Sequence, residues 1–384
     1  MLVASLTFLI ACTAFAVDIS LPALPAMAEA TGSTIAEAER TIGVFLLGYA
    51  LGHLPMGMLS DRFGRKPIML IGMSCFVLLG LGTALVNDIN TLLALRAFQG
   101  FVAASGAVLS RAVARDITQG QATVRLLAYL ASAMGMAMIA APAVGSLALW
   151  LFGWSGPFAA SALWGGIGLL LCIFFVPETR PEGATGSVWK ALGTGLAAFT
   201  ATRAARYGAL IAAATFCGIM TLVTISPHVF MGVEALTPFQ FAMTFSFISA
   251  GYVTGALITR AYAKRLSDHQ LLRAVAIGFI ACLLPLGLVA ALGQINASIL
   301  VMSVLLGLFG SSLGLASAIA LKPLGHVAGV AAGALGTIQL SSGALFSYAS
   351  TYFHVETMPS LLAVFACLSC LVATLIFLYL RNVT

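Results

Sequence analysis

Twelve long apolar runs divide this chain of 384 residues, and no other sequence feature constrains its fold as strongly. A helix needs about 20 apolar residues to cross the ~30 Å hydrocarbon core of a bilayer. Runs of that length lie at approximately residues 2–28, 36–59, 67–87, 91–113, 122–149, 155–177, 207–231, 238–260, 271–292, 297–320, 327–350 and 358–380. With 61% hydrophobic residues, the chain also lacks the polar surface of a soluble globule. We predict an all-α integral membrane protein with twelve transmembrane helices.

The first apolar run has a second interpretation, because Ala26-Met27-Ala28 resembles a signal-peptidase site. A signal peptide requires a basic segment followed by an apolar core of about 7–15 residues. Residues 2–17 contain no Lys or Arg, and the run continues through Asp18. We therefore predict that residues 2–28 form the first span and are retained.

The basic residues predict the orientation of the chain. In alternate loops, all of them except Arg40 and Arg96 fall on one side of the membrane. By the positive-inside rule, both termini are predicted to be cytoplasmic. We expect a multi-pass protein of the bacterial cytoplasmic (inner) membrane, in contact with membrane lipids. The net charge of +6 follows from this topology, so we expect no nucleic-acid partner.

A dense group of charges separates the second and third runs. Asp61, Arg62, Arg65 and Lys66 place four ionised side chains within six residues, so this segment is predicted to be a short aqueous turn. The stretch 57–67 closely resembles the G-x-L-x-D-R-x-G-R-[KR] signature of the major facilitator superfamily of transporters. That resemblance implies two bundles of six helices each.

Further segments strengthen the resemblance. The sequence from Arg96 through Gln99 to Gly100 is similar to the R-x-x-Q-G element of that superfamily. Asp18-Ile-Ser-Leu-Pro-Ala-Leu-Pro, together with the pair Arg115-Asp116, resembles the Bcr/CflA drug-export subfamily, whose members are proton antiporters.

The fifth run carries an element similar to the antiporter motif G-P-x-x-G-G. Gly135, Pro142 and Gly145 fit this pattern, and we expect them to act in helix packing. Ala141 and Ser146 stand where the family usually has glycine, and this departure weakens the implication of antiport.

The longest polar interval, residues 178–206, separates six runs from six. We predict an N-terminal bundle at 1–177, a cytoplasmic linker at 178–206 and a C-terminal bundle at 207–384. A weak internal repeat agrees with this division, because Gly48-Tyr49-x-x-Gly52 recurs 203 residues later as Gly251-Tyr252-x-x-Gly255.

Two charged residues lie well inside the predicted spans, namely Asp18 and Arg96. A charge there costs about 3 kcal/mol unless it lines a cavity, pairs or becomes neutral. We interpret Asp18 as the proton acceptor and Arg96 as the cation that tunes it. The alternative is a static ion pair that holds two helices together. For His53 we expect a packing role.

The candidate substrate-binding residues are chosen by side-chain type within the spans. Thioethers and aromatic rings form adaptable walls for varied apolar ligands. The candidates are Met134, Met138, Gln99, Phe216, Phe241 and Phe245, and a packing or lipid-facing role is the alternative for each. Gly329 and Gly333 in the eleventh run are expected to permit close helix packing.

The charged turn also suggests a conformational latch. The eleventh run is predicted to begin near Val327 at the cytoplasmic surface, where the positive end of its dipole can bind an acidic side chain. The resemblance assigns that role to Asp61, with Gly57, Arg62, Arg65 and Arg115 in support. Alternatively, Asp61 only caps a turn and the cations only enforce topology.

From these features we predict a proton-coupled exporter of small amphiphilic molecules such as antibiotics, working by alternating access as a monomer. An exporter or importer of one metabolite, such as a siderophore, a sugar or an amino-acid derivative, is the alternative. An integral-membrane enzyme would need a nucleophile with its base or a metal set within the spans, and the sequence shows neither. We expect no metal, no cofactor and no ATP-binding loop.

Overall fold

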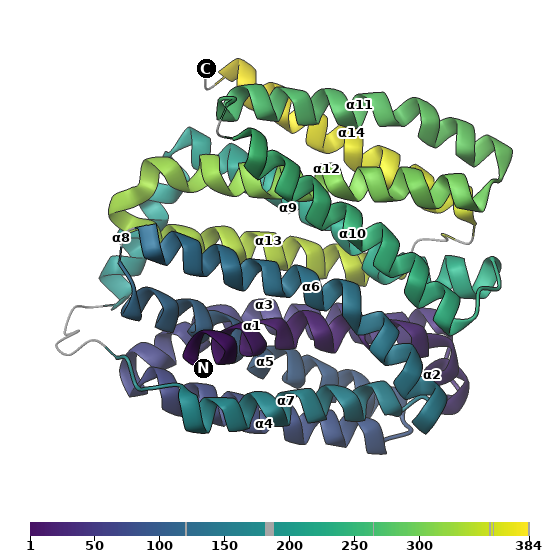
Figure 1. Ribbon diagram of the computed structural model, residues 1–384, viewed down its shortest axis with the longest axis horizontal. Helices are drawn as coiled ribbons and strands as arrows, with labels where there is room; N and C mark the ends of the chain where they lie inside the picture. The colour runs from purple at the N-terminus through teal and green to yellow at the C-terminus, as the bar shows by residue number, and fades with distance from the viewer. Residues whose placement is uncertain (120, 181–187, 264, 353–354, 356, 383–384) are drawn as a thin grey trace. The chain divides into compact units, whose positions relative to one another are not determined.

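The computed structural model describes residues 1–119, 121–180, 188–263, 265–352, 355 and 357–382, and these residues form helices and short connections (Figure 1). Twelve of these helical segments are long and apolar enough to cross a membrane, and they lie where the twelve apolar runs predicted them. The predicted all-α fold with twelve transmembrane helices is confirmed.

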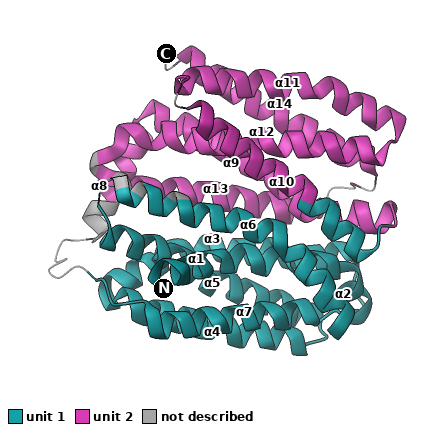
Figure 2. Cartoon of the chain, in the orientation of Figure 1, with its two compact units in different colours: residues 1–185, 236–246 teal, residues 186–235, 247–384 magenta. Residues whose placement is uncertain are grey.

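The chain divides into two compact units, which Figure 2 colours separately. Unit 1 comprises residues 1–185 and 236–246. Its helices are α1 (Leu2–Asp18), η1 (Leu21–Ala23), α2 (Leu24–Thr31), α3 (Ile35–Phe63), α4 (Arg65–Leu85), α5 (Ile89–Ile117), α6 (Gln121–Phe152) and α7 (Gly156–Phe175), together with the start of α10.

Unit 2 comprises residues 186–235 and 247–384. It contains α8 (Val188–Ala201), α9 (Arg203–Pro227), η2 (His228–Val233), most of α10 (Pro238–Tyr262), α11 (Asp268–Leu292), α12 (Ile295–Leu321), η3 (Lys322–Val327), α13 (Ala328–Ser350) and α14 (Met358–Asn382). The helix α8 lies within the interval 178–206, for which the sequence analysis predicted only a linker.

The first span is interrupted where the sequence contains prolines. The helix α1 ends at Asp18, and a single 3-10 turn, Leu21–Ala23, leads into α2. Pro22 and Pro25 each lack a backbone N–H and so cannot continue the hydrogen-bond ladder of α1. Because of this interruption, Asp18 is the last residue of its helix.

Two glycines bring α3 and α5 into backbone contact. A Cβ added at Gly48 would fall on the carbonyl oxygen of Ala97, and one added at Gly52 would fall on that of Phe101. Small residues spaced in this way let membrane helices approach closely and gain packing energy.

The same arrangement occurs in unit 2. Gly251 and Gly255 of α10 lie against the carbonyl oxygens of Ser303 and Gly307 in α12, again with no room for a side chain. The glycine pairs that the sequence repeats at an interval of 203 residues therefore make equivalent helix contacts in both units.

Candidate functional site

Asp18 lies in the interior of unit 1, at the end of α1. Only 4% of its surface is exposed. Its carboxylate makes no hydrogen bond or ion pair within the part of the chain that the structure describes. An acidic group without a donor or a counter-charge in a membrane helix is expensive, so the position calls for a functional explanation.

Small residues of α6 hold the end of α1 in place. Ala137 and Ala141 pack in one apolar cluster with Phe15 of α1 and with Ile19, the residue that follows α1. Gly145, one further turn along α6, lies so close that an added Cβ would fall on the carbonyl oxygen of Ile19. Ala141 is completely buried, so a small side chain at this position is part of the packing beside Asp18.

Arg96 is a second buried charge of unit 1, and its side chain is completely enclosed. One guanidinium nitrogen, Nη1, donates to Oε1 of Gln99 at 2.9 Å. The other, Nη2, donates to the carbonyl oxygen of Ala16 at 3.2 Å. Gln99 in turn donates through Nε2 to the carbonyl oxygen of Phe76 at 3.4 Å. Three helices, α1, α4 and α5, are therefore joined through this pair.

Two aromatic rings cover the guanidinium group of Arg96. Its central carbon lies 4.3 Å from the ring centroid of Phe45 and 5.5 Å from that of Phe158. Each such cation–π contact stabilises a desolvated cation by about 2 kcal/mol. Together with the hydrogen bonds, they offset the ~3 kcal/mol that an arginine costs in the hydrocarbon core. Arg96 is thus stabilised without a carboxylate.

The structure brings Arg96 to the end of α1 but does not pair it with Asp18. The nearest link is the hydrogen bond to Ala16, two residues before Asp18. No ion pair joins the two charged side chains. The static ion pair considered as an alternative is therefore absent from this structure, in which Nη1 and Nη2 of Arg96 donate to Gln99 and Ala16.

Glu39 is a buried carboxyl that the sequence analysis missed. It is 7% exposed, and its Oε1 atom has no hydrogen-bond partner. In the sequence Glu39 stands beside the polar residues Glu37 and Arg40, a pattern typical of an exposed helix start. Helical spacing was the available signal, since Ile42 and Leu46, three and seven residues further on, share its buried face.

His53 lies in the same helix, α3. Its Nδ1 atom is 2.8 Å from the carbonyl oxygen of Tyr49, and its ring meets the Tyr49 ring edge-on with centroids 4.4 Å apart. These contacts agree with the packing role that the sequence analysis expected.

The charged turn is built around Gly64, the single residue between α3 and α4. Its φ of +104° lies in a region that side chains with a Cβ rarely adopt. A Cβ at this position would also meet the carboxylate of Glu178 at 2.5 Å. The glycine of the D-R-x-G-R segment is therefore required by both the backbone and its surroundings.

Arg65 connects two acidic residues at this end of unit 1. It forms an ion pair with Asp61 one helical turn earlier, and its Nε donates to Asp116 at 3.1 Å. The hydroxyl of Thr179 donates to the same Asp116 oxygen at 3.0 Å. In this structure the Asp61 carboxylate is therefore engaged inside its own unit.

Glu178 follows α7 and closes the charged turn, and the sequence analysis did not single it out. Its Oε1 accepts backbone N–H groups from Arg65, Thr179 and Arg180 at 2.8–2.9 Å, and its Oε2 accepts that of Lys66 at 3.2 Å. Partial desolvation raises the pKa of Glu178, but these four donors together lower it below its usual value.

The remaining residues of the predicted latch have no ion-pair partner within the described parts of the chain. The guanidinium of Arg62 lies 5.2 Å from the ring of Phe63. Arg115 donates through Nε to the carbonyl oxygen of Arg111 at 3.3 Å. A Cβ at Gly57 would meet only Val108, at an ordinary 3.7 Å.

The candidate wall residues have different surroundings. Gln99 is buried and bound to Arg96. Met134 receives a contact from Arg111 through its sulfur at 3.5 Å, while Met138 is half-buried. Phe241 and Phe245 are fully buried in the part of α10 that belongs to unit 1, with ring centroids 5.8 Å apart. Phe216 lies against Gly343 of α13 in unit 2. Their assignment to substrate binding stays a prediction.

The glycines and the proline that we expected to act in helix packing differ in how closely other residues surround them. Gly135 and Pro142 are buried in α6. A Cβ at Gly333 would meet none of the described atoms within 4 Å, so none of the described helices packs closely on that position. Gly329 is the second residue of α13, and its surroundings are outside the described part of the structure.

The family model of the Major Facilitator Superfamily matches residues 6–347, which is most of the chain. The chain belongs to the Major Facilitator Superfamily. The family membership that the charged turn predicted is confirmed. The structure therefore shows how a transporter of this family arranges the proline break after α1, the Arg96–Gln99 pair and the Gly64 turn.

Several curated bacterial relatives match nearly the whole chain. The uncharacterized MFS-type transporter YdgK of Bacillus subtilis is 27% identical and covers 86% of this chain and 83% of its own. The bicyclomycin resistance protein homolog of Haemophilus influenzae is 26% identical, with 96% and 93% covered. The chloramphenicol resistance protein of Pseudomonas aeruginosa is 28% identical, with 81% and 74% covered. The predicted resemblance to drug exporters is confirmed by these relatives.

Among solved structures, the fold is similar to that of the xylose transporter XylE from E. coli in a partially occluded inward-open conformation. The TM-score is 0.77, with 14% sequence identity, and the match covers 100% of this chain and 97% of that one. This similarity establishes the major facilitator fold.

Proposed function

We propose that this transporter exports small amphiphilic molecules, antibiotics among them, in exchange for protons by alternating access. The observation that carries the proposal is Asp18, a buried carboxyl in a membrane helix to which none of the described residues binds as a cation or a donor. Binding a proton removes the charge and with it most of the cost of burial. Asp18 is therefore suited to load and release a proton as its surroundings change.

Arg96 supplies a fixed positive charge near the same end of α1. Because its guanidinium group is held by Gln99, Ala16 and two aromatic rings, it can stay charged while Asp18 changes its protonation state. A movement that brings Asp18 closer to Arg96 favours the ionised carboxylate and expels the proton. A movement away favours the neutral form and takes a proton up.

The substrate class is supported by the relatives. Two of them are named for resistance to bicyclomycin and chloramphenicol, and resistance conferred by a transporter implies export. A membrane potential of 100 mV supplies ~2.3 kcal/mol for each charge moved, which is enough to drive modest uphill export. The rocking of two bundles around a shared substrate site, common to this fold, would provide alternating access.

The test is drug transport in everted membrane vesicles energised by a pH gradient. Asp18→Asn is expected to reduce gradient-driven transport to the level of vesicles without the protein, while Asp18→Glu retains part of it. The matched control is Glu29→Gln, which removes an exposed carboxyl from the same span and should leave transport unchanged. Full gradient-driven transport by Asp18→Asn would overturn the proposal.

We also propose that the Asp61–Arg65 network takes part in the conformational cycle. The support is that Arg65 already links Asp61 to Asp116 and, through its backbone, to Glu178. Asp61→Asn should lower transport while the amount of folded protein in the membrane stays the same. Normal transport by this variant would leave Asp61 with only a role in the turn.

A further inference from the structure

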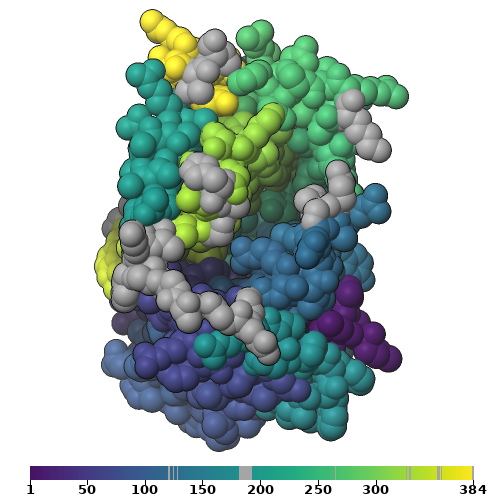
Figure 3. All heavy atoms as spheres, turned by 90° about the vertical axis from the view of Figure 1, so that its left-hand side faces the viewer, coloured from purple at the N-terminus to yellow at the C-terminus, as the bar shows by residue number. Residues whose placement is uncertain are grey.

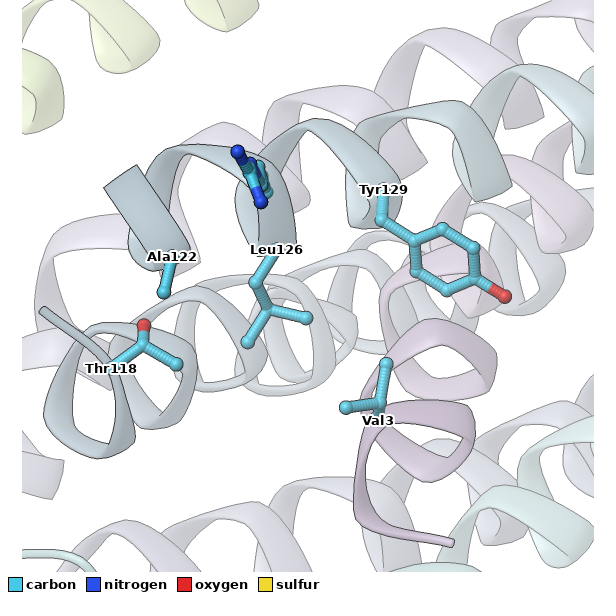
Figure 4. Close-up of a pocket in the computed structure, with 6 residues that line it drawn as sticks. Val3, Thr118, Ala122, Leu126 and Tyr129 are labelled. Atoms are coloured by element: carbon cyan, nitrogen blue, oxygen red, sulfur yellow. The ribbon is translucent and has the colours of Figure 1, made fainter. Parts of the chain in front are cut away.

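A shallow hollow of about 510 Å³ lies where α1, α5 and α6 come together at their ends. It is lined by Val3, Thr118, Ala122, Arg125, Leu126 and Tyr129. Figure 4 shows Thr118 and Ala122 at one end of the hollow, Val3 and Tyr129 at the other end, and Leu126 between them. All of these residues belong to unit 1.

The hollow lies where three candidate membrane spans begin or end. The first candidate span begins at Leu2, the fourth ends at Ile117 and the fifth begins at Arg125. Since successive spans cross in alternate directions, these three ends lie on the same side. In Figure 3 the N-terminal part of the chain, in purple, lies at the surface beside blue atoms of the fifth span. The hollow is thus level with the lipid headgroups.

The lining combines one cation with an apolar wall. Arg125 is exposed and forms no ion pair with the residues that the structure describes. Tyr129, one helical turn further along α6, is 57% exposed, and Val3 is 41% exposed. Tyrosine is typical of the interface between headgroups and hydrocarbon, because its ring is apolar and its hydroxyl is polar.

We propose that this hollow binds one anionic phospholipid. Arg125 bonds the phosphate, and the first part of an acyl chain lies against Val3, Leu126 and Tyr129. The charge of Arg125 is complementary to a phosphate diester, and its guanidinium fork fits two phosphate oxygens at once. A soluble anion would make no use of the apolar wall, and a lipid without net charge would leave the cation uncompensated.

The location agrees with this ligand. The predicted excess of Lys and Arg places this surface on the cytoplasmic side, where the leaflet carries anionic lipids. A basic residue near such a surface contributes ~1 kcal/mol to lipid binding, which corresponds to about a fivefold change in affinity. The bound lipid would connect the first span to the turn that joins the fourth and fifth spans.

The experiment uses the purified full-length protein, stripped of lipid in a neutral detergent. Phosphatidylglycerol and phosphatidylcholine with identical acyl chains are titrated separately, and bound lipid is counted by native mass spectrometry. We expect one phosphatidylglycerol to bind at least about fivefold more tightly than phosphatidylcholine. Arg125→Gln should remove that preference, and Tyr129→Ala should weaken both lipids.

The control variant is Arg203→Gln, which removes an exposed arginine at the start of α9 and should keep the preference. A further arm adds inorganic phosphate or glycerol 3-phosphate in place of lipid. Competition by either at millimolar concentration would show that a free phosphate suffices, and it would overturn the lipid assignment. Equal affinity for the two lipids, or an unchanged preference in Arg125→Gln, would overturn it as well.

Discussion

The two units bury different kinds of polar side chain. Among the described residues, unit 1 buries the carboxyl groups of Asp18 and Glu39 and the guanidinium group of Arg96 within its spans. The buried polar residues described for unit 2 are all serines and threonines. Both units nevertheless bring a glycine pair against the backbone of a neighbouring helix in the same way. The difference therefore lies in chemistry and is not a consequence of the fold.

The hydroxyls of unit 2 join its helices to one another. Thr215 of α9 and Ser312 of α12 are 3.0 Å apart, and Thr224 of α9 and Ser347 of α13 are 2.6 Å apart. Hydrogen bonds of this kind contribute ~0.6 kcal/mol between membrane helices. They stabilise packing and carry no net charge. Among the described residues, the buried carboxyl and guanidinium groups therefore lie in unit 1, while the buried hydrogen bonds between helices of unit 2 join neutral hydroxyls.

The largest effect on stability is expected for Arg96→Leu. Removal of the guanidinium leaves Oε1 of Gln99 and the carbonyl oxygen of Ala16 without their donors, at ~1–3 kcal/mol for each buried group. We expect unfolding in mixed micelles to become easier by about 2–4 kcal/mol and transport to be lost. Arg203→Leu, at an exposed position, is the control. Unchanged stability of Arg96→Leu would mean that the buried hydrogen bonds of Arg96 do not stabilise unit 1.

The next largest effect is expected at the glycine contacts between helices that both units share. Gly52→Leu and Gly255→Leu each force a side chain onto a carbonyl oxygen of the neighbouring helix. Overpacking of this kind costs about 1–3 kcal/mol, and we expect similar losses of melting temperature for both variants. The controls are Gly166→Leu in unit 1 and Gly287→Leu in unit 2, where an added Cβ meets no described atom within 4 Å. A large loss in only one unit would contradict the shared contact.

A smaller, pH-dependent effect is expected at the charged turn. The pKa of Glu178 is lower in the folded protein than its ordinary value of about 4.3. A depressed carboxyl pKa contributes stability above the unfolded value and loses it as the pH falls through the folded value. Glu178→Gln should therefore lower the melting temperature at pH 7, and this loss should be smaller at pH 3. An equal loss at both pH values would contradict an electrostatic role.

The smallest effect is expected for Thr224→Val in unit 2. This variant removes one interhelical hydrogen bond worth ~0.6 kcal/mol and changes no charge, so pH-gradient-driven transport should persist with a slightly lower melting temperature. Thr254→Val, which removes a hydroxyl bonded within its own helix, is the matched control. Loss of proton coupling in Thr224→Val would mean that unit 2 also takes part in proton chemistry.

The sequence by itself determined the class of protein, the twelve spans and the superfamily. The thickness of the bilayer sets the length of an apolar run, and water must solvate a group of charges such as Asp61 to Lys66. The internal repeat is also visible in the sequence, since Gly48 and Gly52 recur as Gly251 and Gly255. These features depend on neighbours along the chain, so they can be deduced without coordinates.

Only the tertiary structure decided which groups surround the charges. Arg96 binds Gln99 and Ala16 instead of Asp18, Glu39 is buried without a partner for one oxygen, and Glu178 closes the turn after Gly64. Membrane helices are apolar on nearly every side, so their sequences do not indicate which face packs inward. Contacts between distant spans depend on which face of each helix packs inward. In this structure the packing leaves Asp18, the candidate proton acceptor, without an ion pair to Arg96, the cation that the sequence analysis expected to tune it.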